Sequence, residues 1–167
     1  MDLDSLLKKE GIPGIYDLDT RALTKKIRQS GVMNGRLTTC EPTAEGTKEL
    51  SDWNIQKAVE NVTTKKSYEV PCGIPGRHVV LWDFGAKQNI IRKLHAHNCK
   101  VTVVPSTATC EEILALKPDG IMLSNGPGNP KDNPSIIKEL RKLCTFQIPT
   151  FGICLGHQLL ALANGAD

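Results

Sequence analysis

Residues 148–160 read Ile-Pro-Thr-Phe-Gly-Ile-Cys-Leu-Gly-His-Gln-Leu-Leu, a short apolar run that passes directly into a helical pattern. The run at 148–153 is apolar without alternation, as expected of a strand that is buried on both faces. Residues Leu155 to Ala163 then carry the apolar spacing of a helix. The stretch therefore predicts a strand followed at once by a helix, with Cys154 at the junction between them.

The same strand-then-helix pattern occurs three times upstream of this junction. Each apolar run is followed by a segment with helical spacing, and Thr109 with Glu112 forms a capping box at the start of one of these helices. The expected strands are 79–82, 101–104, 120–123 and 148–153, and the clearest expected helix is Pro134 to Leu143. Such alternation predicts an α/β fold with a doubly wound, mostly parallel sheet covered on both faces.

The first part of the chain is less regular. Residues 3–39 resemble a piece of an α/β domain, with a short helix at 5–10 and a longer one at 20–30, which Asp17 or Asp19 can cap. Residues 40–77 contain several Pro and Gly turn signals and are expected to be a linker with one short helix at 53–60. We therefore expect two domains, at 1–70 and 71–167.

Composition restricts the possible functions. The 167 residues have a formal net charge of only +3, spread along the chain, which gives no reason to expect binding to nucleic acid or to an anionic membrane. No window has the ~20 apolar residues of a membrane span, and residues 1–4 do not resemble a secretory signal. The six cysteines form no CxxC pair and no zinc-ligand spacing, so we expect no metal site and a reduced, cytoplasmic setting.

Cys154 has the surroundings of a nucleophile. Gly152 and Gly156 flank it two residues away on either side, which is the nucleophile-elbow spacing with cysteine in place of serine. A nucleophile on so sharp a turn is strained, and side chains at the flanking positions would collide with it. The free N–H groups and the dipole of the helix N-terminus also favour a thiolate. The alternative interpretation is a core cysteine in a tight strand-to-helix turn, with glycines that serve packing alone.

A second glycine-containing loop follows the expected strand at 120–123. It reads Ser124-Asn-Gly-Pro-Gly-Asn-Pro130, and loops at this end of a parallel strand border the binding crevice of doubly wound sheets. Gly126 and Gly128 allow bare backbone N–H groups to approach a substrate, where they can stabilise a developing oxyanion. The alternative is an ordinary turn. The loop matches no phosphate-binding pattern.

Taken together, the two motifs resemble those of class I glutamine amidotransferases. Two further segments, Asp17 to Thr24 and Trp82 to Ile90, resemble the small subunit of carbamoyl-phosphate synthetase. The resemblance covers nearly the whole chain except residues 40–77. It implies a flavodoxin-like amidotransferase domain, of which 71–167 is the first half, preceded by the end of a smaller N-terminal α/β domain.

The resemblance also implies roles for individual residues. Cys154 would attack the side-chain amide of L-glutamine to form a thioester and release ammonia. The N–H groups of Gly126 and Leu155 would hold the oxyanion, and Gly128 and Gln158 would help to seat glutamine. Ammonia would pass to a large partner subunit that makes carbamoyl phosphate. ATP and magnesium belong to that partner, so no cofactor is expected in this chain.

The chain departs from the family pattern in its general base. The family uses a histidine that is oriented by a glutamate far downstream, whereas the residues after Gln158 include neither. His157 is expected to pack or orient the helix instead of acting as the base. We therefore expect this polypeptide, when alone, to hydrolyse glutamine poorly and to leave its last strand as an open sheet edge. The alternatives are a non-catalytic docking subunit of the same complex, another class I amidotransferase and a different cysteine hydrolase.

Overall fold

The computed structural model describes residues 2–31, 33–53, 55–73 and 76–166. The chain forms two compact units, Met1–Trp53 and Asn54–Asp167, which are considered separately below. No helix among the described residues is both long and apolar enough to cross a membrane.

The first unit contains three helices, α1 (Leu3–Glu10), α2 (Thr20–Ser30) and α3 (Ala44–Asp52), and its described residues form no strand. The two helices expected here are confirmed, and Asp19 is the residue that caps α2. The helix expected at 53–60 is wrong. Helix α3 lies earlier because the Thr43 hydroxyl accepts the N–H of Gly46 at 3.0 Å and caps it, whereas residues 56–62 form turns.

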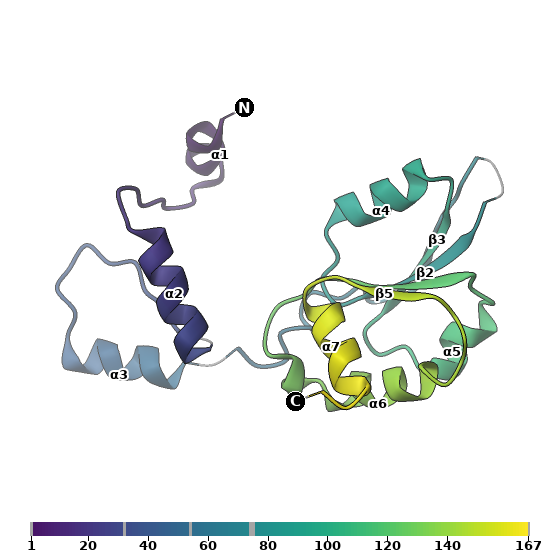
Figure 1. The fold of residues 1–167 in the computed structure, drawn as a ribbon. Helices are drawn as coiled ribbons and strands as arrows, with labels where there is room; N and C mark the ends of the chain where they lie inside the picture. Colours follow the sequence, from purple (N-terminus) through teal and green to yellow (C-terminus); the bar gives the residue numbers. More distant parts are fainter. Residues whose placement is uncertain (1, 32, 54, 74–75, 167) are drawn as a thin grey trace. The chain divides into compact units, whose positions relative to one another are not determined.

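The second unit is built on a five-stranded sheet (Figure 1). Its strands are β1 (Tyr68–Val70), β2 (His78–Asp83), β3 (Lys100–Pro105), β4 (Gly120–Leu123) and β5 (Thr150–Gly152). Their order across the sheet is β1-β3-β2-β4-β5, and all neighbours are parallel except β1, which is antiparallel to β3. The doubly wound, mostly parallel α/β fold is therefore confirmed.

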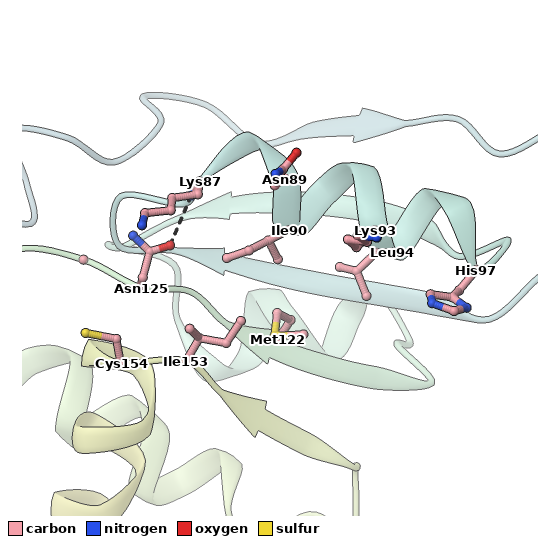
Figure 2. Close-up of a pocket in the computed structure, with 11 residues that line it drawn as sticks. Lys87, Asn89, Ile90, Lys93, Leu94, His97, Met122, Asn125, Ile153 and Cys154 are labelled. Atoms are coloured by element: carbon pink, nitrogen blue, oxygen red, sulfur yellow. Dashed lines mark hydrogen bonds between the residues drawn. The ribbon is translucent and has the colours of Figure 1, made fainter. Parts of the chain in front are cut away.

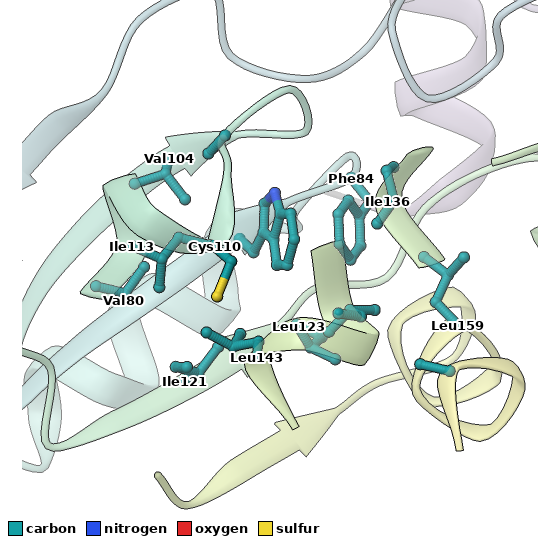
Figure 3. Packing of buried hydrophobic residues seen from close by; sticks show 14 of the residues in the cluster. Val80, Phe84, Val104, Cys110, Ile113, Ile121, Leu123, Ile136, Leu143 and Leu159 are labelled. Carbon is teal, nitrogen blue, oxygen red and sulfur yellow. The ribbon is translucent and has the colours of Figure 1, made fainter. Parts of the chain in front are cut away.

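Helices cover the sheet on both faces. Helix α4 (Gln88–Ala96) lies on one face, and α5 (Cys110–Ala115), α6 (Pro134–Leu143) and α7 (Leu155–Ala163) lie on the other (Figure 1). The larger core lies between the sheet and helices α5, α6 and α7. There Val80, Ile121 and Leu123 from the strands meet helix side chains such as Ile113 and Leu159 (Figure 3). A smaller core around Leu81, Ile91 and Val101 lies under α4.

The second unit begins before the expected boundary at residues 70 and 71. The side chain of Val59 is only 2% exposed and belongs to the larger core, so the segment before β1 packs on the sheet. Strand β1 was not predicted from the sequence. It pairs with β3 from Tyr68 opposite Val103 to Val70 opposite Val101, and its three residues are too few for an alternation pattern to be visible.

The strand order places a topological switch point between β2 and β4. From β2 the chain moves to β3 on one side, and from β4 it moves to β5 on the other side. In open α/β sheets, ligands bind in the crevice outside the carboxyl ends of the strands at this point. Here the loops at 84–87 and 124–129 border that crevice.

Candidate active site

Cys154 occupies a strained turn between β5 and α7. Its backbone has φ 51° and ψ −112°, a combination that side chains of L-residues rarely tolerate. The residue is exposed, although its neighbour Leu155 is only 1% exposed. The turn therefore presents the thiol to solvent and directs the following side chain into the core, as a nucleophile elbow does.

The flanking glycines are required by the close approach of backbone. A Cβ atom on Gly152 would lie 2.6 Å from the backbone nitrogen of His157. A Cβ atom on Gly156 would lie 2.5 Å from the carbonyl oxygen of Leu123. A side chain is excluded at both positions, as predicted, although at Gly156 the collision is with β4 and not with the turn itself. Strands β4 and β5 can approach the start of α7 only because these side chains are absent.

Cys154 is one of the residues that line a cavity of about 640 Å³. Helix α4 forms one wall of this cavity, and Met122 and Ile153 lie on the opposite side (Figure 2). Cys154 and Asn125 lie near one end, and His97 lies at the other (Figure 2). The lining residues are Lys87, Asn89, Ile90, Lys93, Leu94, His97, Met122, Asn125, Gly126, Ile153 and Cys154.

Gly126 lies on the same cavity as Cys154, in the loop after β4. A side chain at Gly126 would collide with the carbonyl oxygen of Phe84 and would come within 2.6 Å of Leu155 Cδ2. Among the described residues, the backbone N–H groups of Gly126 and Leu155 have no hydrogen-bond acceptor, whereas the N–H of Gly156 is bonded to Ser124 O at 3.1 Å. Beside the turn that carries Cys154, two backbone N–H donors of the kind that an oxyanion requires are therefore free of hydrogen bonds to described residues.

The other two residues expected to seat glutamine lie outside this cavity lining. Gly128, with φ +83°, borders a second cavity of about 470 Å³, where its Cα faces the side chain of Ala58. Gln158 lies on the exposed surface of α7, one residue after the exposed His157. Their proximity to a bound substrate remains a prediction.

Asp83 connects the loop at 84–87 to residues 63 and 64, and sequence reasoning did not single it out. This buried carboxylate accepts the N–H groups of Gly85 and Ala86 through Oδ1, at 2.9 and 2.7 Å, and that of Thr64 through Oδ2 at 2.7 Å. The Thr63 hydroxyl donates to the Asp83 carbonyl at 2.6 Å. An acidic residue directly after an apolar strand was the available signal, because a buried carboxylate must find donors.

Among the described residues, no histidine is hydrogen-bonded to Cys154, and His157 lies exposed in the first turn of α7. His78 contacts Thr102 Oγ1 at 2.8 Å, and His95 contacts the carbonyl oxygen of Pro71 at 3.1 Å. His97 lies at the far end of the cavity (Figure 2). Nor do three or more His, Cys, Asp or Glu side chains in the described part of the chain gather as a metal site would require.

The remaining thiols differ in exposure, which makes them useful internal references. Cys40 and Cys144 are exposed like Cys154, Cys72 and Cys99 are half-buried, and Cys110 is buried. Burial is the main reason why the pKa of the Cys110 thiol is raised, and the charges of Glu111 and Glu139 add to it. Exposure alone therefore does not distinguish Cys154 from Cys40 and Cys144.

Comparison with known proteins agrees with this geometry. Residues 80–167 match the family model "Glutamine amidotransferase class-I", and residues 1–37 match "Carbamoyl-phosphate synthase small chain, CPSase domain". The chain is 49% identical over 168 residues to the carbamoyl phosphate synthase small chain of Streptococcus pneumoniae, across 99% of this chain and 46% of that protein. The corresponding proteins of Streptococcus mutans and Listeria monocytogenes are each 48% identical, over 100% and 99% of this chain and 46% and 45% of theirs. The chain therefore spans about half the length of these relatives.

Proposed function

Because the chain belongs to the class I glutamine amidotransferase family, we propose that it is the nucleophile-bearing part of a carbamoyl-phosphate synthase small chain. Its substrate is L-glutamine, and its product is ammonia for a large partner subunit that makes carbamoyl phosphate. The similarity to such small chains extends over 99% of this chain, including the first unit, which the amidotransferase model does not cover. That breadth favours this assignment over another class I amidotransferase.

The proposed reaction proceeds through a thioester on Cys154. The thiolate attacks the side-chain amide carbon of glutamine, and the amide oxygen becomes an oxyanion that the N–H groups of Gly126 and Leu155 hold. The C–N bond then breaks, and the nitrogen leaves as ammonia after it takes up a proton. Water hydrolyses the remaining thioester to glutamate and regenerates the thiol.

The single observation that carries the proposal is the placement of Cys154. The residue is exposed, its backbone has φ 51° and ψ −112°, and it lines the same cavity as Gly126. A cysteine that served packing alone would not require a strained turn that faces a cavity.

Other parts of the reaction are assigned to the remainder of the complex. The resemblance implies that the proton is moved by a histidine, oriented by a glutamate, in the part of the relatives that this chain does not span. ATP and magnesium are proposed to act on the large partner subunit. In this chain the proposed chemistry uses protein groups alone.

Labelling with a glutamine-like electrophile, such as its diazoketone analogue, tests the proposal. In the full-length small chain, we expect Cys154 to react well before the exposed Cys40 and Cys144, and we expect glutamine to protect it. Peptide mass spectrometry gives the rate at each thiol, and simple alkylation by iodoacetamide controls for exposure.

If Cys154 reacts no faster than Cys40 and Cys144, and glutamine does not protect it, the proposal fails. The result would then favour the non-catalytic docking subunit. Fast labelling of Cys154 that glutamine does not slow would instead favour a different cysteine hydrolase on the same scaffold.

A further inference from the structure

Ser124 begins the loop at 124–129 that borders the crevice, but its own atoms do not reach the crevice surface. It follows β4 directly, and its side chain and backbone are 0% exposed. A residue that is fully covered cannot touch a substrate, so any effect on catalysis has to pass through its neighbours.

The bonds of Ser124 join three segments that are distant in sequence. Its N–H donates to the Trp82 carbonyl at 3.1 Å, and its hydroxyl accepts the N–H of Phe84 at 2.8 Å, which ties it to the end of β2. Its carbonyl accepts the N–H of Gly156 at 3.1 Å, which ties it to the helix that follows Cys154.

The hydroxyl of Ser124 also donates to the carbonyl oxygen of Asn125 at 2.7 Å. That carbonyl belongs to the same peptide unit as the N–H of Gly126. In a planar trans peptide, the C=O and N–H bonds point in opposite directions, and the described chain contains no cis peptide. Holding the carbonyl of Asn125 toward the buried hydroxyl therefore turns the N–H of Gly126 away from Ser124.

Two hydrogen bonds hold the side chain of Asn125 as well. Its amide donates to the Gly85 carbonyl at 2.9 Å, and its oxygen accepts the N–H of Lys87 at 3.1 Å. The bond between Asn125 and Lys87 appears as the dashed line in Figure 2. With the side chain and the carbonyl of Asn125 both fixed, its peptide plane has little freedom to rotate.

We propose that Ser124 is a positioning residue whose hydroxyl locks the Asn125–Gly126 peptide plane and thereby aims the Gly126 N–H at the oxyanion. This inference rests on the proposed function, because it assigns the orientation of one of the two proposed donors. A donor that is fixed before reaction stabilises the developing charge without reorganisation, and loss of one such donor lowers kcat on the order of 100- to 1000-fold. Loss of the lock, which leaves the donor in place but free to turn, should have a smaller effect.

The test compares turnover with simple alkylation in the full-length small chain assembled with its large subunit. For Ser124→Ala, we expect kcat for glutamine hydrolysis to fall roughly 10- to 100-fold, with KM within about twofold of wild type. Alkylation of Cys154 by iodoacetamide should keep its rate, because that reaction forms no oxyanion. Ser124→Cys, which fills the space and has only a weak donor, should show the same separation of the two rates.

Ser106→Ala is the matched control, since it removes a hydroxyl from a serine that is only 4% exposed and lies just after β3. It should change neither rate. Wild-type kcat in both Ser124 variants would overturn the inference and leave the proposed function intact. An equal fall in kcat and in the alkylation rate would also overturn it, because it would indicate general disturbance of the turn. A wild-type complex that hydrolyses no glutamine would overturn the proposed function, and the inference with it.

Discussion

Gly156, in the first turn of α7, lies directly against the backbone of Leu123 at the end of β4. A Cβ at Gly156 would lie 2.5 Å from the carbonyl oxygen of Leu123 and 2.7 Å from its carbonyl carbon. Because both of these Leu123 atoms belong to the backbone, they cannot move aside easily. This close contact joins α7, the helix that follows Cys154, to β4, the strand that leads into the loop containing Gly126. The positions of the thiol and of the proposed oxyanion donor therefore depend on the same contact.

Gly156→Ala should therefore destabilise the second unit. We expect a loss of about 1–3 kcal/mol, as is typical when a methyl group is forced into a packed site, together with slower labelling of Cys154 by a glutamine-like electrophile. Gly73→Ala is the control, because nothing lies within 4 Å of a Cβ at that position. Equal urea midpoints for the two variants would contradict the packing argument.

The strain at Cys154 predicts an unusual order of stability between two inactive variants. Cys154→Gly relieves the conformation at φ 51° and ψ −112°, whereas Cys154→Ala keeps it. The relief is on the order of 1–2 kcal/mol, and the greater unfolded-state entropy of glycine offsets about half of it. We expect the free energy of unfolding of Cys154→Gly to exceed that of Cys154→Ala by about 0.5–1 kcal/mol in thermal or urea unfolding. An alanine variant as stable as the glycine variant would show that the turn is not strained.

Asp83→Asn should loosen the loop at 84–87, which borders the crevice, and the segment around Thr64. The substituted amide keeps one acceptor oxygen for the three backbone N–H groups that Asp83 binds at Gly85, Ala86 and Thr64. Leaving buried donors unpaired costs about 1–3 kcal/mol. Hydrogen exchange should accelerate at Thr64 or at Gly85 and Ala86. Asp119→Asn provides the comparison, because among the described residues the exposed side chain of Asp119 accepts only one backbone N–H, that of His78 at 2.7 Å. Unchanged exchange in Asp83→Asn would refute the anchoring role.

The pairing of α5 with α6 predicts a pH dependence of stability. The N–H of Cys110, which donates to Glu139 at 2.9 Å, and the ammonium of Lys142 at 2.8 Å hold the pKa of Glu139 below its ordinary value. Since the pKa is lower in the folded state, the contribution of Glu139 is present above the unfolded value of 4.5 and is lost as the pH falls through the folded value. Glu139→Gln should therefore be less stable than wild type at pH ~7, and the difference should shrink below pH ~4.

Urea midpoints at several pH values check this expectation. Glu111→Gln is the control, because the Glu111 side chain is 71% exposed and lies 3.6 Å from the same Lys142. A stability difference for Glu139→Gln that stays constant from neutral to acidic pH would contradict the proposed origin.

Much of the fold was predictable because the second unit repeats one simple pattern. The bounds of α6 and of β4 were expected to the residue, since Pro134 begins a helix well and the apolar run at 120–123 ends in a glycine-rich loop. The capping box of Thr109 and Glu112 formed as expected. These features depend on neighbours within four residues, which a sequence displays directly.

What could not be predicted depends on partners that are far apart in the chain. Ser124 appeared only as the first residue of a glycine-rich loop, and its role became visible when the fold placed Phe84, forty positions earlier, beside it. The collisions at Gly152 and Gly156 could be predicted, but their partners could not. Strand β1 exists because β3 offers it a free edge, which no local pattern encodes.

The most direct test of Cys154 as the nucleophile is the rate of ammonia release from glutamine by the full-length complex, wild type against Cys154→Ala. Removing a covalent nucleophile eliminates the thioester route, so we predict that the variant is at least about a thousandfold slower while it still unfolds cooperatively. Ammonia release by Cys154→Ala within about tenfold of the wild-type rate would contradict the account, because attack by this sulfur would then not be required.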